Sequence, residues 1–249
     1  MFKSNIVKCQ KPYTLHSDAS ASLLYAASVR GNTEIVKILL LNGYYDSNYV
    51  HNNDSSPLYV ACQENKLETV KILVANGADI EFKFREGFTP LYVASQRGNV
   101  DVVNFLIKSG ANINSACVNG STPLYIASQE GQVDVIDQLV KNYANLEAPF
   151  RRGFTSVYVA ARNGHLNAVK RLISYGANAE STDHDGSTPI YVASQNGYHE
   201  IVRELISQKV YADSSFLGGY TPLYVASQNG HDKCVEDLLK TKININKKA

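Results

Sequence analysis

The sequence predicts an all-α fold built from seven stacked helix-turn-helix units. The first observation is a recurring motif, which reads TPLYVASQ from Thr89 and again from Thr221. The second is a helical apolar period that follows each motif. The third is the spacing, 34 residues once and 33 thereafter, typical of solenoids in which each unit packs on its neighbours. The units begin near Ser22, Ser56, Thr89, Thr122, Thr155, Thr188 and Thr221.

The unit that begins at Thr89 illustrates the expected elements. Thr89 is a suitable N-cap, and Pro90 suits the first helical position because the N–H that it lacks has no partner there. A helix is predicted over 90–97, ended by Gly98 in a left-handed conformation. A second helix is predicted over 100–109, since its apolar residues recur at helical spacing. An extended finger then leads to the next unit.

The array is predicted to occupy residues 20–249. Residues 1–19 do not share the repeat and are predicted to form an N-terminal arm or a partial cap. The chain is either complete or cut from something longer, and the sequence leaves both readings open.

Composition narrows the class of protein. Apolar residues make up 44% of the chain and charged residues 19%, which suits a folded protein. The net charge of +1 gives no strong attraction toward nucleic acid or an anionic membrane. There is neither an apolar stretch long enough to span a membrane nor a secretory signal. The four cysteines form no ligand cluster, so we expect free thiols in a reducing compartment, cytoplasmic with a nuclear location also compatible.

One run of the chain resembles a known repeat family. GFTPLYVASQRGNVDVVNFLIKSGANIN is similar to the ankyrin repeat pattern, and the resemblance covers residues 20–249. It implies an ankyrin-repeat solenoid of antiparallel helix pairs with β-hairpin fingers. It also implies a concave groove that binds other proteins and no intrinsic catalytic activity.

The chain departs from the family pattern in two ways. Tyrosine replaces the usual histidine in every unit, which predicts a ladder of half-buried rings with hydroxyls bonded to backbone or water; a binding role is the alternative. The glycine after the second helix is replaced by Tyr143, Lys209 and Lys242, where a strained or different cap is expected. The ladder consists of Tyr25, Tyr59, Tyr92, Tyr125, Tyr158, Tyr191 and Tyr224.

Catalytic chemistry has no support in the sequence. There is no HExxH, no phosphate-binding glycine loop and no GxSxG. Asp183, His184 and Asp185 suggest a metal, but three consecutive loop residues do not readily converge on one ion, and ordinary tip polarity is the preferred interpretation. His165 and His231 follow the glycine between helices and are expected to be structural. The prediction is therefore no enzyme, no cofactor and no metal.

The resemblance places partner-facing residues at finger tips, before the capping threonine and late in the first helix. Every second finger carries a pair of aromatic residues. The first ring of each pair is Phe84, Phe150 or Phe216, at intervals of 66 residues, and the second ring follows four positions later. For the first ring of each pair, packing within the array and binding to a partner both remain open. Aromatic and arginine side chains most often dominate interface energy. The candidate partner-binding residues are Arg85, Phe88, Arg97, Arg151, Arg152, Phe154, Arg162 and Tyr220.

The five arginines in this list make the middle of the groove basic, which favours a protein partner with an acidic segment. Nucleic acid is the competing ligand class, and Glu86, Glu130 and Asp185 on the same surface disfavour it. The wider partner-facing set includes Asn163 and Asn196. We expect a scaffold that is monomeric alone. The alternatives are the recognition part of a larger protein (a channel, kinase, toxin or ubiquitin-ligase adaptor) and a microbial effector that binds a host protein.

Overall fold

The computed structural model describes residues 18–41, 45–50, 55–214 and 219–241. Residues 1–17 of the predicted arm, Phe216 and Lys242 lie outside the described residues, and the last two residues of that arm, 18 and 19, begin the first helix. Within these ranges the chain forms fourteen helices in seven pairs and no extended strand. The first helices of the pairs are α1 (Asp18–Arg30), α3 (Pro57–Gln63), α5 (Pro90–Arg97), α7 (Pro123–Gln129), α9 (Ser156–Arg162), α11 (Pro189–Gln195) and α13 (Pro222–Gln228). The second helices are α2 (Thr33–Leu41), α4 (Leu67–Ala75), α6 (Val100–Lys108), α8 (Val133–Lys141), α10 (Leu166–Ser174), α12 (His199–Ser207) and α14 (Asp232–Leu239).

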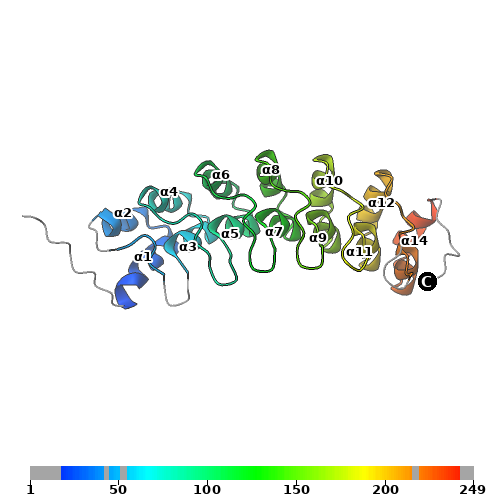
Figure 1. Ribbon diagram of the computed structural model, residues 1–249, viewed down its shortest axis with the longest axis horizontal. Helices are drawn as coiled ribbons and strands as arrows, with labels where there is room; N and C mark the ends of the chain where they lie inside the picture. The colour runs from blue at the N-terminus through cyan, green and yellow to red at the C-terminus, as the bar shows by residue number, and fades with distance from the viewer. Residues whose placement is uncertain (1–17, 42–44, 51–54, 215–218, 242–249) are drawn as a thin grey trace, which may run out of the picture.

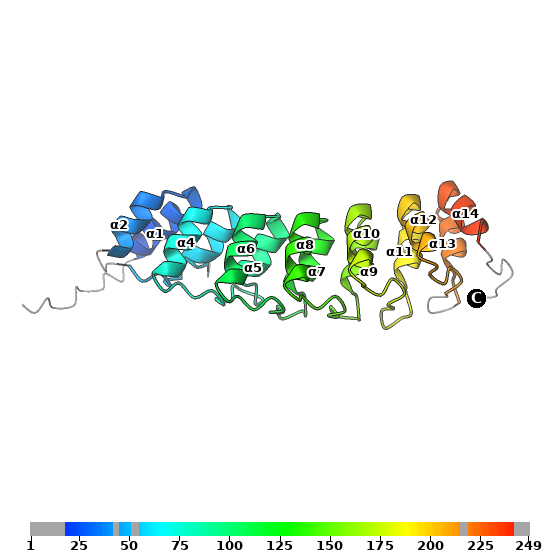
Figure 2. The same cartoon turned by 90° about the horizontal axis from the view of Figure 1, so that it is seen from above.

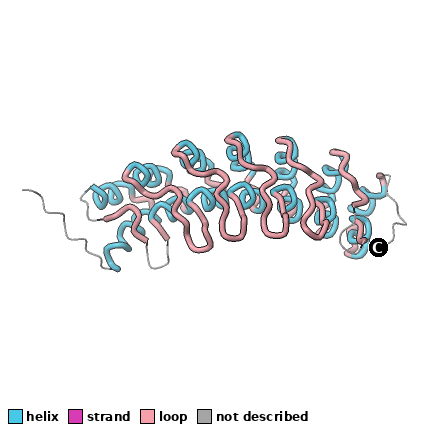
Figure 3. The backbone as a smooth tube through the Cα atoms, viewed as in Figure 1, coloured by secondary structure: helices cyan, strands magenta, loops and turns pink. Residues whose placement is uncertain are grey.

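The pairs stack side by side into a long, gently arched body (Figures 1 and 2). Each first helix packs against its own second helix and against the first helices of neighbouring units. The second helices lie along the outer, convex edge, and the loops that join units extend from the opposite, inner edge (Figure 3). The predicted all-α ankyrin-type solenoid is confirmed.

Local sequence explains where the helices begin and end. The Thr89 hydroxyl accepts the Tyr92 backbone N–H at 3.2 Å, and the corresponding threonine or serine caps the first helix of units two to seven. Gly98 ends α5 at φ 75°, as predicted. Helix α6 ends at Lys108, one residue before the predicted boundary, with Ser109 as its C-cap.

The core runs continuously between the two rows of helices. Each second helix buries one apolar face, as with Val102, Val103 and Leu106 of α6, all fully inaccessible to solvent. The first helices carry small buried residues, such as Ala94 and Ala127, where they contact one another. Small side chains there allow close approach of adjacent units and fix the curvature of the stack.

The fingers are shorter than the expected β-hairpins. Among the described residues, two fingers form a single antiparallel bridge each, between Phe84 and Phe88 and between Phe150 and Phe154. Arms this short leave no room for continuous strands. Successive tips are instead joined by single backbone hydrogen bonds, from Val118 N to Glu86 O (2.7 Å), Arg151 N to Asn119 O (3.4 Å) and His184 N to Arg152 O (2.7 Å).

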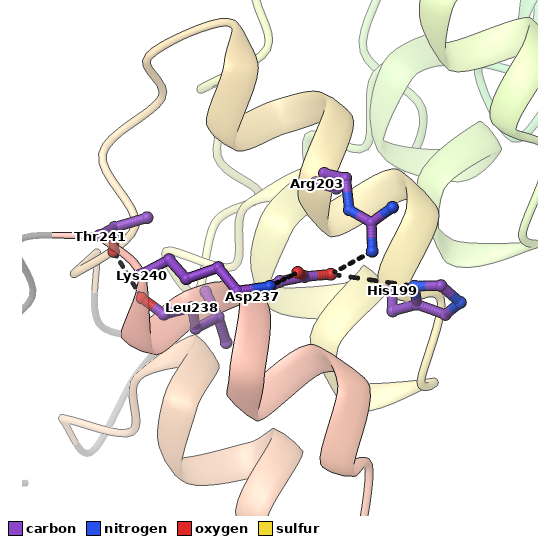
Figure 4. Close-up of polar contacts among 6 residues, drawn as sticks. All are labelled: His199, Arg203, Asp237, Leu238, Lys240 and Thr241. Carbon is purple, nitrogen blue, oxygen red and sulfur yellow. Dashed lines mark hydrogen bonds and ion pairs between the residues drawn. The ribbon is translucent and has the colours of Figure 1, made fainter.

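The C-terminal pairs are joined by a cluster of charges around Asp237 (Figure 4). Its carboxylate accepts from Arg203 of α12 at 3.2 Å and from Lys240 at 2.8 Å, and His199 Nδ1 lies 3.8 Å away. Burial opposes ionisation of Asp237, but the hydrogen bonds from Lys240 and Arg203 outweigh it, so its pKa is lowered. The cluster therefore ties α14 to α12.

Candidate functional site

The inner face, defined here as the finger tips and the exposed ends of the first helices, carries the predicted partner-binding residues. Arg97 ends α5 and Arg162 ends α9, and both side chains are exposed. Arg85, Arg151 and Arg152 lie at finger tips and are exposed as well. The structure thus gathers the predicted arginines along one side of the array.

The phenylalanines of the fingers stack on the tyrosine ladder. Phe84 lies against Tyr59 of the preceding unit, with ring centroids 4.7 Å apart, and Phe88 stacks on Tyr92 of its own unit at 4.7 Å. We call these four residues the first quartet. The second quartet is Tyr125, Phe150, Phe154 and Tyr158, with ring contacts at 4.5 and 4.7 Å.

This stacking limits what the rings offer to a partner. Phe88 and Phe154, predicted to bind, are half-buried against tyrosines rather than fully presented, and Tyr220 is 40% exposed while contacting Tyr224 at 4.8 Å. Phe84 and Phe150, for which packing and binding were both open, do pack within the array. Only the outer edges of these rings remain available for contact.

Two arginines cover the quartets. The Arg85 guanidinium lies 5.0 Å from the Phe84 ring centroid, and the Arg151 guanidinium lies 5.2 Å from that of Phe150. Such cation–π contacts orient the cation while leaving its N–H groups free to donate. Arg152 differs, because it donates to Asp185 of the next finger at 3.0 Å. Its charge is therefore already paired.

The ladder tyrosines fall into two alternating kinds. The Tyr92 hydroxyl lies 3.3 Å from the Ser121 hydroxyl, and the Tyr158 hydroxyl donates to Ser187 at 3.2 Å. The hydrogen-bond partner of these two tyrosine hydroxyls is thus a serine hydroxyl, whereas backbone or water was expected. The hydroxyls of Tyr59 and Tyr125 have no hydrogen-bond partner among the described residues, and neither oxygen is fully buried.

The tyrosine rings are also more buried than the half-buried ladder that the sequence predicts. Tyr59, Tyr92, Tyr125, Tyr158 and Tyr191 are each less than 8% exposed, and residues of the next finger contact the first four. Burial raises the pKa of Tyr59 and of Tyr92 to about 12, so both remain neutral at physiological pH. The rings at the two ends are less covered, because Tyr25 is half-buried and Tyr224 is exposed.

Several residues near the inner face are used within the array. The side-chain amides of Asn163 and Asn196, predicted to face a partner, donate to the carbonyls of Gln129 and Arg162 in preceding units. Their donors are therefore not free. His165 Nε2 lies 2.9 Å from the Gln129 carbonyl and His231 Nε2 3.1 Å from that of Gln195, which confirms the structural role expected of both histidines.

The Asp183 finger makes a turn from the residues considered for a metal. The buried Asp183 carboxylate accepts the backbone N–H groups of Asp185 and Ser187, at 3.0 and 2.8 Å. In the described part of the chain, no cluster of three or more histidine, cysteine, aspartate or glutamate residues has metal-binding geometry. Cys62 is a buried free thiol whose pKa burial raises, which leaves it poorly reactive.

One open hollow lies on the outer row of helices. It holds about 440 Å³ between α8 and α10 and is lined by Val133, Asn167, Lys170, Arg171 and Ser174. None of the predicted partner-binding residues lines it.

Comparison with known proteins agrees with this geometry. The sequence matches the family described as ankyrin repeats (3 copies) over residues 3–84, 23–117, 81–150 and 157–249. The chain belongs to the ankyrin repeat family. The array is similar to the crystal structure of the human ASB11 ankyrin repeat domain, at 25% sequence identity and a TM-score of 0.78, over 87% of this chain and 96% of that one.

Family membership bears directly on function. Ankyrin repeats act as protein-interaction modules, and the fold is typically non-catalytic. None of the helices in the described ranges of the array combines the length and the apolar character that crossing a bilayer requires.

Proposed function

We propose that this ankyrin array is a non-catalytic scaffold that holds an acidic segment of a partner protein on its inner face. The observation that carries the proposal is the set of four arginines, Arg85, Arg97, Arg151 and Arg162, on that face. All are exposed, and none forms an ion pair within the described residues. By contrast, Arg152 on the same face and Arg171 and Arg203 on the second helices are each paired with an aspartate.

Preformed geometry supports the proposal. The tips are joined by backbone hydrogen bonds, and Arg85 and Arg151 lie over aromatic rings. Few side chains of the array therefore lose conformational freedom when a partner binds. Unpaired guanidinium groups recognise carboxylates through charge-assisted, often bidentate, hydrogen bonds. Phe88, Phe154 and Tyr220 would add apolar contact at their exposed edges.

A second candidate is that the array serves as the recognition part of a larger protein. The similarity to a chain described as an ankyrin repeat domain favours it. In that case the inner face keeps its role and brings a bound partner to the rest of the protein.

The two end-of-helix arginines give a clean test. The variant Arg97→Gln with Arg162→Gln removes two charges from the inner face, and Lys108→Gln with Lys141→Gln removes two from exposed ends of outer helices. Lysate capture is compared for the wild type and both variants, with melting curves to verify folding. We expect partner yield to fall at least tenfold for the arginine variant alone, given about 1.5 kcal/mol or more per charged hydrogen bond. Equal yields from all three proteins would contradict the proposal.

A further inference from the structure

The basic residues of the inner face form two matching groups. In the first, Arg85 covers Phe84, which stacks on Tyr59, and Arg97 ends the helix of the same unit. Burial raises the pKa of Tyr59, and the positive charges of Arg97 and Arg85 act against that rise. We call Tyr59, Arg85 and Arg97 the first basic site.

A similar arrangement recurs two units later, with the helix-end arginine one repeat position earlier. Arg151 covers Phe150, which stacks on Tyr125, and Arg162 ends α9. Burial raises the pKa of Tyr125 as well, and Arg162 and Arg151 again oppose the rise. Tyr125, Arg151 and Arg162 are the second basic site, and its tyrosine hydroxyl, like that of Tyr59, has no partner among the described residues.

One carboxylate, Glu130 at the end of α7, lies between these sites, and a second, Glu86, lies beside Arg85 on the finger tip of the first site. The Tyr92 hydroxyl is held by Ser121, and burial raises its pKa with a further contribution from Glu130 and Glu86. Glu86 accepts from the Asn119 amide at 3.1 Å and Glu130 from the Gln129 amide at 3.0 Å, so neither charge is compensated. The inner face therefore reads basic, acidic, basic along the stack.

We propose that the two basic sites are separate anion-binding sites that together grip one protein segment, whose two acidic groups lie two units apart with a basic group between them. The inference rests on the proposed function and adds a spacing and a charge order to it. Each site offers two exposed guanidinium groups, which are donors suited to a carboxylate or a phosphorylated side chain. A segment with acidic residues clustered at one place engages only one site.

The expected separation follows from unit packing. Helices pack about 8–10 Å apart, so the two sites lie roughly 20 Å from each other. Two weak contacts on one chain reinforce each other when the linker matches this span. A nucleic acid strand carries negative charge without interruption, so the carboxylates of Glu86 and Glu130 would repel it.

Synthetic peptides test the spacing without knowledge of the natural partner. The spaced probe has two Glu-Glu pairs joined by a glycine-serine linker of about twelve residues, whose average span is roughly 20 Å, with a lysine at its centre. Its isomer has the same composition with all four glutamates adjacent. A third probe replaces each pair in the spaced peptide by phosphoserine. Binding to the full chain is measured by fluorescence anisotropy at low and physiological salt.

We expect the spaced probe to bind about tenfold or more tightly than its isomer, because the second contact is intramolecular. Arg85→Gln with Arg97→Gln, and Arg151→Gln with Arg162→Gln, should each reduce it to the isomer's affinity. Glu130→Gln should weaken binding of the probe with lysine and not of one with a central alanine. The phosphoserine probe shows whether carboxylate or phosphate is preferred.

Equal affinities for the spaced probe and its isomer would overturn the two-site inference, as would an effect of only one arginine pair. That result is distinct from failure of the proposed function, which is judged by partner capture with the Arg97 and Arg162 variant. Circular dichroism and melting curves for each variant separate loss of binding from loss of folding.

Discussion

At the residue scale, the tyrosine of each motif does different work in alternate units. Tyr92 and Tyr158 bond a serine hydroxyl of the next finger, whereas Tyr59 and Tyr125 contact a phenylalanine there and keep a free hydroxyl. Tyrosine at one repeat position thus forms a side-chain hydrogen bond in some units and leaves its hydroxyl without a partner among the described residues in others.

Removing single hydroxyl groups separates these two roles. Tyr92→Phe leaves the buried Ser121 hydroxyl without its partner, so the unfolding free energy should fall by about 1 kcal/mol. Tyr59→Phe breaks no hydrogen bond within the described residues and should change stability by less than about 0.5 kcal/mol. Urea unfolding followed by circular dichroism measures both. Equal losses would show that the hydroxyl contacts do not differ.

Alkaline pH should unfold the array through the same residues. The folded-state pKa of Tyr59 and Tyr92 is about 12 against an ordinary value of 10.0, so the folded chain holds these protons more tightly than the unfolded chain. Their contribution to stability is complete below pH 10 and falls as pH rises from 10 to 12. As pH rises, the phenolate absorbance of the buried tyrosines should increase over the same range in which the helical circular dichroism signal is lost. Ionisation of every tyrosine near pH 10 with the helices intact would contradict this.

At the element scale, the turns after the second helices show how sequence and backbone agree. Gly77, Gly110 and Gly176 take φ values of 81–93° there. Tyr143 and Lys209 occupy the same position at φ 69° and 60°, so the predicted strained cap is present at both. A side chain in this region costs about 1–2 kcal/mol per residue.

Tyr143→Gly should therefore stabilise the array. Tyr143 is 90% exposed, so its replacement removes little packing while it relieves the left-handed strain. We expect a gain of about 1 kcal/mol, measured by thermal or urea unfolding. Tyr143→Ala is the matched control, since alanine removes the ring but keeps the strain. A gain of the same size from alanine would assign the effect to the ring.

The cluster around Asp237 gives a second prediction for an element, the attachment of α14. Because the pKa of Asp237 is lowered from its ordinary 3.8, the carboxylate contributes stability above about pH 4 and loses it as pH falls further. Asp237→Asn should reduce stability by about 1–2 kcal/mol at pH 7, since charged hydrogen bonds from Arg203 and Lys240 are lost. The unfolding free energies of the wild type and of the Asp237→Asn variant should become equal near pH 2. Hydrogen exchange of α14 at both pH values measures this, and a constant difference would contradict it.

Much of the fold could be predicted because each unit repeats strong local signals. Thr89 and Pro90 fix the start of α5, and Gly98 fixes its end. The finger was less predictable, because its shape depends on contacts with the next unit, as between Val118 and Glu86. At the candidate site, the exposed arginines follow from their position in the repeat, whereas the pairing of Arg152 with Asp185 joins residues 33 apart that no local pattern connects.

At the scale of the whole molecule, the main helix contacts of the described residues join each unit to its neighbours. Stability in such arrays is approximately a sum of unit and interface terms. A substitution that destabilises one unit should therefore affect that unit and its neighbours most. Leu139→Ala in α8 removes a fully buried side chain at a cost of about 2–5 kcal/mol. Hydrogen exchange should accelerate in α7 to α10 while α3 and α13 keep their protection. Uniform acceleration along the array would show one cooperative body instead.

The alternation of phenylalanine and serine fingers constrains how such a protein gains or loses length. Loss of 33 residues around unit four would bring Phe150 onto Tyr92, which Phe88 already covers, and would remove the Ser121 that its hydroxyl needs. Loss of 66 residues would join two units of the same kind, so each remaining tyrosine would keep a next finger of the kind that it has now. Viable insertions and deletions in this lineage should therefore come in pairs of repeats.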